Sequence, residues 1–407
     1  MITTTWDQID AGTLQALCDA GAPESPTLDF KRVAPLKQGE DPRNEFAKDV
    51  CAFANANGGD LVYGIATRED CADTLAPLSG ESADACKRRL SEVLANHVEP
   101  RIAGVRFKDL PIDERGFALV VRVPRSFDAP HRYKVRSHDG VHAHHRFVTR
   151  SDTGTLDMDY AQLRDSFGRT ATLVEQARAF RATRLRLMMS EGQLLHGFEQ
   201  GHPKFCVHLV PLAGLIQATA INISDVYHRH DINFAKPGGF VPQKQTNLDG
   251  LLMTGSRDAI TGRIGWLVRL FRSGAMEYLA QASSQVAAED GGDAFIPAVA
   301  TSREIRRVCG QLLSHARALG LEGPALLGLA GVNTARHPFR IFGNGTHYGN
   351  TLADREHLVL ADHWIDELSA ETDIDTAARP MLDEYWQCFG EVRCELYDEA
   401  GQWRTAT

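Results

Sequence analysis

Two carboxylates and an amine lie close together near the start of the chain, at Glu24, Asp29 and Lys31. Residues 27–31 alternate like a short β-strand, which places Asp29 and Lys31 on one face and Phe30 on the other. Carboxylate oxygens are the ligands that Mg²⁺ and Mn²⁺ prefer, and a nearby ammonium could neutralise a phosphate under attack. A structural role fits the same residues: Glu24 would cap a turn, and Asp29 and Lys31 would form an exposed ion pair.

Further candidates lie in the basic segment 101–150, where eleven Arg and Lys residues face five Asp and Glu residues. The whole chain has a formal net charge of -9, which argues against binding a polyanion over its entire surface. Arg and Lys contact phosphates, while unpaired bases stack on Tyr, Phe and His. Basic side chains also protect exposed sheet edges, so a structural role is the alternative. The residues we expect to bind nucleic acid are Arg132, Tyr133, Lys134, Arg136, Arg146 and Arg150.

A polar turn at Asn55, Asn57, Gly58 and Gly59 is a candidate phosphate site, because backbone N–H groups at such turns can bind anions. An ordinary helix C-cap explains both glycines equally well. The chain has no GxxxxGK[ST] motif, so ATP as a ligand depends on this turn alone.

The elements that position these residues belong to two domains, since 407 residues exceed one typical core. Residues 1–168 alternate strands and helices, which predicts an α/β domain; residues 169–192 read as a helical connector, and residues 193–407 as an α+β domain. In the first domain we expect a helix that begins with Asp41 as its N-cap, strands at 61–65, 101–107 and 117–123, and helices at 82–96 and 160–167. In the second we expect strands at 205–212, 264–271 and 324–332 and helices at 302–319 and 381–389.

The composition, 43% hydrophobic and 24% charged residues, is that of an ordinary globular protein. No apolar run approaches the roughly 20 residues that span a bilayer, and the start MITTTWDQID lacks the pattern of a secretory signal. The eight cysteines are scattered without a CxxC pair, which indicates free thiols. We therefore expect a cytoplasmic protein with no membrane partner.

Several motifs occur in order along the first domain: ESPTLDFK at 24–31, CAFANANGG at 51–59 and LVYGI at 61–65. They resemble the ExxxxEFK signature, the AFANxxGG helix end and the following hydrophobic strand of bacterial Schlafen/AlbA_2 domains. HRYKVRSHDG at 131–140 and HHRFVTRSD at 144–152 are similar to the closing strands of that domain. The resemblance covers roughly the first 165 residues.

The resemblance implies a nucleic-acid-handling domain, which in the animal Schlafen proteins cleaves RNA at three carboxylates. Carried over, the first is Glu24 and the second is Asp29, one methylene shorter than the family's glutamate. The third is expected at position 67, where Thr67 stands, although a longer loop would let Glu69 fill the place. The expected catalytic residues are Glu24, Asp29, Lys31 and Glu69, and the expected ligands of Mg²⁺ or Mn²⁺ are Glu24, Asp29, Glu69 and Asp70.

The leading prediction is a metal-dependent endoribonuclease of the bacterial Schlafen type, used in phage defence or stress. Its substrate would be transfer RNA or other structured or single-stranded RNA, with single-stranded DNA as a further candidate. The alternative is a non-catalytic AlbA_2 module that binds nucleic acid or ATP and regulates, with Thr67 marking lost catalysis. Animal Schlafen cores have two related lobes and this chain has one copy, so a homodimer is expected, together with a protein partner or trigger that controls activity.

Overall fold

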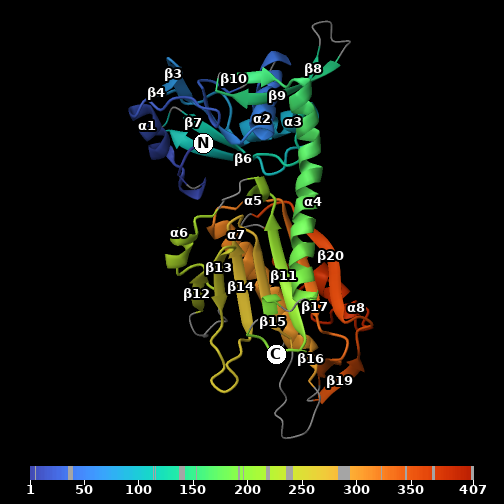
Figure 1. Cartoon of the computed structure of the whole chain (residues 1–407). Helices are drawn as coiled ribbons and strands as arrows, with labels where there is room; N and C mark the ends of the chain where they lie inside the picture. The colour runs from blue at the N-terminus through green and yellow to red at the C-terminus, as the bar shows by residue number, and fades with distance from the viewer. Residues whose placement is uncertain are drawn as a thin grey trace. The chain divides into compact units, whose positions relative to one another are not determined.

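The computed structural model describes the chain outside residues 5, 35–39, 113, 115, 137–142, 153, 191–192, 196, 217–220, 235–241, 283–293, 322, 344–345, 369–371 and 405–407. For residues 40–42, 136, 143, 170, 193, 342–343 and 346–348 it describes the backbone alone. The chain divides into two compact units, Met1–Thr172 and Leu173–Thr407, and the division falls inside helix α4 (Tyr160–Ser190). Figure 1 shows the elements of each unit.

A four-stranded mixed sheet forms the centre of the first unit, with helices on both faces. Helix α1 (Ala11–Asp19) shares one apolar cluster with the sheet, and helices α2 (Glu40–Asn55) and α3 (Ala83–His97) share the other. Central strands covered on both faces read as continuous apolar runs, as LVY and FALVV do here. The strand order is β1 (Leu28–Lys31), β2 (Gly59–Tyr63), β7 (Gly116–Val123) and β6 (Arg106–Ile112), with β1 and β2 parallel and the other pairs antiparallel.

A second four-stranded sheet packs against α2 and carries the basic segment. Its strand order is β10 (Gly154–Asp157), β9 (Ala143–Ser151), β8 (Arg132–Arg136) and β5 (Val98–Glu99). A short hairpin of β3 (Ile65–Arg68) and β4 (Cys71–Leu75) completes the described strands of this unit.

Four of the expected boundaries in this unit are wrong, each for a local reason. Helix α2 begins at Glu40, so Asp41 lies inside its first turn and is not the N-cap. The strand expected at 61–65 is interrupted at Gly64, whose φ of +96° ends β2. The strand expected at 101–107 begins only at Arg106. The helix at 160–167 and the helical connector form the single helix α4, because an interior glycine such as Gly168 costs only about 1 kcal/mol and does not end a helix.

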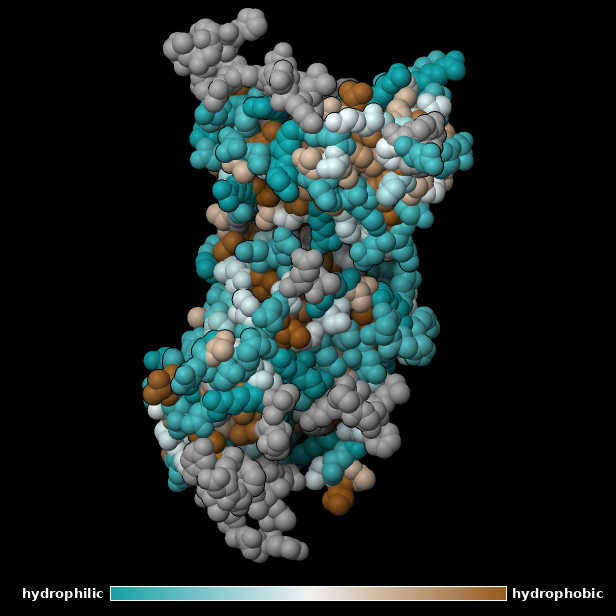
Figure 2. Space-filling view, turned by 180° about the vertical axis from the view of Figure 1, so that it is seen from behind, coloured by the Kyte–Doolittle hydropathy of each residue, from teal (hydrophilic) through white to brown (hydrophobic). Residues whose placement is uncertain are grey.

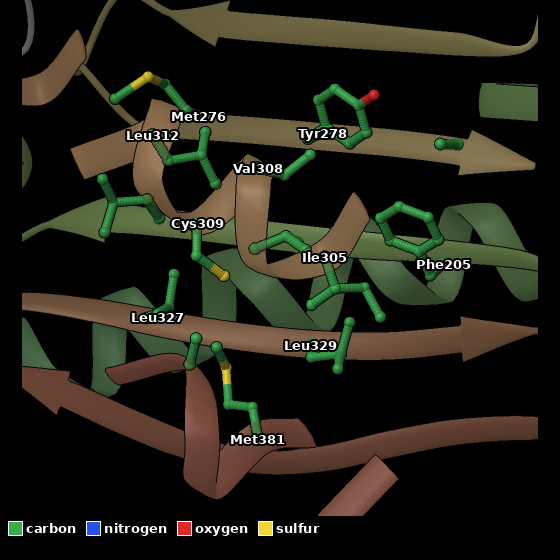
Figure 3. Packing of buried hydrophobic residues seen from close by; sticks show 14 of the residues in the cluster. Phe205, Met276, Tyr278, Ile305, Val308, Cys309, Leu312, Leu327, Leu329 and Met381 are labelled. Atoms are coloured by element: carbon green, nitrogen blue, oxygen red, sulfur yellow. The ribbon is translucent and has the colours of Figure 1, made fainter. Parts of the chain in front are cut away.

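The second unit is built on one seven-stranded antiparallel sheet, which confirms the expected α+β domain. Helices α7 (Ala298–Ala318) and α8 (Ile374–Gln387) bury their apolar sides against one face, and Figure 3 shows Ile305, Val308 and Leu312 of α7 directed at the strands. The strand order is β12 (Gln243–Thr246), β13 (Gly250–Thr254), β14 (Trp266–Phe271), β15 (Met276–Gln281), β11 (Lys204–Pro211), β17 (Ala325–Val332) and β20 (His357–Ile365). Smaller elements are a sheet of β16 (Ile296–Pro297), β18 (Phe339–Gly343) and β19 (Thr346–Thr351), and helices α5 (Ala213–Ile216) and α6 (Ile223–His228).

A buried charge network joins the opposite face of this sheet to the later turns of α4. Glu277 on β15 is 0% exposed and accepts hydrogen bonds from Arg184 of α4 and Arg269 of β14. His208 of β11 contacts the same carboxylate, with Nε2 3.1 Å from Oε2. Burial raises the pKa of Glu277, but these partners outweigh burial and hold the pKa well below its usual range. The carboxylate is therefore ionised and fixes α4 to the sheet.

No helix among the described residues is long and apolar enough to cross a membrane. On the face that Figure 2 shows, hydrophilic residues predominate and hydrophobic ones occur in small groups.

Candidate functional site

Asp29, the second expected carboxylate, is buried in an ion-pair cluster. It is 2% exposed and faces α2, because its neighbour Phe30 packs into the cluster on the α1 side. Arg150 Nη2 donates to Asp29 Oδ1 at 3.0 Å, and Lys31 Nζ lies 2.9 Å from Oδ2. The guanidinium of Arg150 also lies 4.9 Å from the centre of the Phe53 ring. Oδ1 of Asp29 therefore accepts a hydrogen bond from Arg150, whereas Oδ2 has the charge of Lys31 beside it but accepts no hydrogen bond.

Asp49 of α2 is a further carboxylate in this cluster, and the sequence analysis missed it. It is 4% exposed, and its Oδ2 lies 3.8 Å from Lys31 Nζ. Burial raises the pKa of Asp49 to about 6, because the attraction of Lys31 only partly offsets the loss of water. A signal existed: Asp49 stands at helical spacing from Phe46 and Phe53, on the apolar side of the helix.

Lys31 connects the carboxylates of this cluster. Burial lowers its pKa, but the charges of Asp49 and Asp29 outweigh burial and raise the pKa above its usual value. Lys31 is thus a fixed cation whose charge is already matched by two acids.

Glu24 takes the turn-capping role that was the structural alternative. Its Oε1 accepts a hydrogen bond from the backbone N–H of Phe30 at 3.0 Å. Burial raises the pKa of Glu24, and this hydrogen bond acts in the opposite direction. The structure therefore brings Glu24, Asp29, Lys31 and Asp49 into one neighbourhood.

Glu69 and Asp70 lie instead at the tip of the β3–β4 hairpin. Their φ angles of +54° and +57° and the pairing of Arg68 with Cys71 define a two-residue turn of the type that matches strand twist. Both side chains are exposed. The backbone carbonyl of Asp70 accepts a hydrogen bond from the N–H of Glu24 at 2.8 Å. The backbone of the hairpin therefore lies beside Glu24, but the side chains of Glu69 and Asp70 are exposed at the turn. Thr67, at the expected third position, lies exposed in β3.

In this arrangement the four expected carboxylates are not grouped as the ligands of one Mg²⁺ or Mn²⁺ ion. Within the parts of the chain that the structure describes, no group of three or more His, Cys, Asp and Glu side chains could hold a metal ion. The cause is local: Asp29 is occupied by Arg150 and Lys31, and Glu24 by a backbone N–H. A hard cation needs these oxygens free.

The Asn55–Gly59 turn is filled by the protein itself. Asn55 donates to the carbonyls of His131 and Val148 at 2.8 Å each and accepts from the N–H of His131 at 2.7 Å. A Cβ at Gly58 would lie 2.6 Å from the backbone nitrogen of Arg125. The C-cap explanation therefore accounts for this turn, and Asn55 joins α2 to β9 and to His131, the residue that precedes β8.

The basic residues of β8 and β9 divide between the two faces of their sheet. Arg132 pairs in register with Phe147 and Lys134 with His145, so these four share the face turned away from α2. Tyr133 is 2% exposed and packs in the core with α2, which leaves its ring unavailable for stacking on a base. Strand alternation explains the difference.

The other expected nucleic-acid residues differ in exposure. The Arg150 side chain is 8% exposed and serves Asp29. The Arg146 side chain is 46% exposed and pairs with Asp157. The backbone of Arg136 ends β8, and its side chain lies outside the described residues.

Residues 24–159 match the family model described as Schlafen, AlbA_2. No curated protein matches the chain, whereas sixteen chains of solved structures do. One is the N-terminal domain of a protein related to the ATP-dependent DNA helicase RecG from Nitrosomonas europaea: identity is 22%, coverage is 32% of this chain and 83% of that chain, and the TM-score is 0.25. Another is the DIP2311 protein from Corynebacterium diphtheriae, with 15% identity, 38% and 28% coverage and a TM-score of 0.24. The family match and the motifs it spans identify residues 24–159 as a Schlafen AlbA_2 domain.

Proposed function

We propose that the AlbA_2 domain is a nucleic-acid-binding module, with RNA as the favoured ligand, and that it binds through the face of β8 and β9 turned away from α2. The main support is the sorting of charges by the strands. Arg132, Lys134 and His145 share the face that α2 leaves uncovered, while Arg150 turns inward. Cations on one open sheet face are suited to a phosphate backbone.

The acidic neighbours of Arg132 and Arg146 hold these two arginines only weakly. Arg132 pairs with Glu99 on this face, whereas Arg146 lies opposite Tyr133 on the other face, where it pairs with Asp157. These four side chains are between 37% and 67% exposed. Exposed ion pairs contribute about 0–1 kcal/mol, so a polyanion can exchange for the carboxylates at little cost. The same acidic partners reduce the positive electrostatic potential of the sheet. A reduced potential fits a module that binds a nucleic-acid strand without binding every polyanion.

The test is binding of labelled single-stranded RNA and single-stranded DNA to the full chain over a salt series. Replacing both Arg132 and Lys134 by Ala should weaken binding and lower the magnitude of the slope of log affinity against log salt by about 1.4, at about 0.7 per phosphate contact for a single strand. The matched control is Arg106→Ala, an exposed arginine on β6 of the other sheet. Equal affinity and slope in the double variant and the control would refute this site.

Metal-dependent RNA cleavage stays a prediction from family resemblance. It would require Asp29 to exchange Arg150 and Lys31 for a metal ion, and Asp49 is the buried carboxylate best placed to join it. The same binding assay with Mn²⁺ and with EDTA tests this directly. Cleavage that EDTA and Asp29→Asn both abolish would support the nuclease; binding without cleavage in Mn²⁺ would support the module.

A further inference from the structure

Three large apolar side chains are exposed where β10 meets the first turns of α4. Leu156 is 51% exposed, Tyr160 80% and Phe167 62%. Helix α4 begins here because Asp159 and Gln162 form reciprocal side-chain caps on its first N–H groups. The cap fixes the helix and with it the direction of Tyr160 and Phe167.

Phe147 of β9 joins these residues to the basic face. Its ring meets Phe167 edge to face, with centroids 6.1 Å apart and an interplanar angle of 71°. Leu156 pairs in register with Thr149, two residues from Phe147 on the same face of the sheet. We call Phe147, Leu156, Tyr160 and Phe167 the aromatic patch; it continues the face that carries Lys134 and His145.

A charged side chain, Arg164, lies between the exposed rings of α4. Arg164 is separated from Tyr160 by four positions and from Phe167 by three, so the three side chains share one side of α4. The Arg164 side chain is 69% exposed, and its neighbour Asp165 is equally open to water. A basic side chain between two exposed rings matches a ligand that alternates phosphates with flat bases.

We propose that the aromatic patch binds unpaired nucleobases, so that the ligand of this AlbA_2 domain is single-stranded nucleic acid. This proposal rests on the proposed function and specifies the form of its ligand as single-stranded. The bases of a duplex are stacked on one another and present only edges and backbone, whereas a single strand offers base faces to Phe167 and Tyr160. The basic face then contacts the phosphate backbone of the same nucleic-acid strand.

The experiment compares three labelled ligands on the full chain: single-stranded RNA, the same length of duplex RNA, and an abasic single strand. Phe167→Ala should weaken binding of the single strand about tenfold and leave the salt slope unchanged, because stacking releases no counterions. Tyr160→Ala should act in the same direction, and Phe167→Trp should retain affinity. Val33→Ala is the control, an exposed apolar residue of the same unit outside the patch.

The outcomes separate the two proposals. A preference for the base-bearing strand that Phe167→Ala removes supports the aromatic patch. Equal binding of all three ligands, with Phe167→Ala and Val33→Ala both unchanged, would overturn the patch and leave the basic face as the site. Absence of binding to every ligand would overturn the proposed function and the patch together. Because Phe167 is exposed, its variants should fold, and circular dichroism verifies this.

Discussion

Replacing Asp49 by Asn should stabilise the N-terminal unit at neutral pH. Asp49 is 4% exposed, and burial raises its pKa from 3.8 to about 6. A raised folded-state pKa means that the ionised group costs stability: the contribution is favourable below pH about 4 and is lost as pH rises through about 6. A shift of about 2 pKa units corresponds to about 3 kcal/mol. Asn, which resembles the protonated acid, should recover up to that amount at pH 7 and almost nothing at pH 4.

The measurement is hydrogen exchange of the full chain in urea at pH 4 and pH 7. Peptides from β1 and α2 report the free energy of unfolding of the N-terminal unit, and peptides from β11 and β17 provide an internal reference in the other unit. The matched control is Asp73→Asn, which removes an exposed carboxylate of β4 and should leave the exchange unchanged within about 0.5 kcal/mol.

A loss of stability in Asp49→Asn at pH 7 would refute the reasoning. It would show that the ion pair with Lys31, 3.8 Å away, outweighs the cost of burying the carboxylate. A gain in stability would instead identify Asp49 as a residue that the fold retains at a cost, as functional acids often are.

Three other substitutions test the framework of the two units. Asn55→Ala should destabilise the N-terminal unit by about 3 kcal/mol, since it leaves buried backbone groups of His131 and Val148 without partners; urea unfolding measures this. Gly59→Ala should cost about 1–3 kcal/mol in the same assay, because its Cβ would lie 2.4 Å from the Phe53 ring and 2.8 Å from a backbone oxygen. Glu277→Gln should cost the second unit about 3–5 kcal/mol by leaving buried arginines unpaired, and faster exchange in α4 beyond residue 173 would report it.

Local periodicity was enough to find the long helices and several of the central strands. The stripe of Cys86, Leu90 and Val93 predicted α3, and all three side chains are buried. Continuous apolar runs likewise predicted β11, β14 and β17, because strands at the centre of a sheet covered on both faces bury nearly every residue. These features depend only on neighbours along the chain.

The partners within the charge clusters could not be read from the sequence. Asp29 and Arg150 are 121 positions apart. No periodicity in the sequence predicts that their strands, β1 and β9, which belong to different sheets, meet at α2. Glu277 and His208 are brought together in the same way, by the pairing of β11 with β15. Asp49 could have been found, since an acidic residue on the apolar side of a helix needs a buried partner.

The magnitudes of the ion pairs separate the arginines that a strand can recruit from the one that it cannot. Removing one partner from a buried pair such as Arg150 and Asp29 costs about 3–5 kcal/mol, whereas an exposed pair such as Arg132 and Glu99 contributes about 1 kcal/mol or less. In the proposed binding mode, a phosphate backbone therefore displaces Glu99 at a much smaller free-energy cost than Asp29. The binding free energy of a metal ion at Asp29 would have to exceed the larger of these two costs. The ion would also have to compete with Lys31 for the same carboxylate. Binding on the open face needs no such rearrangement, and for this reason the arrangement of charges favours a module that holds nucleic acid over a site that cleaves it.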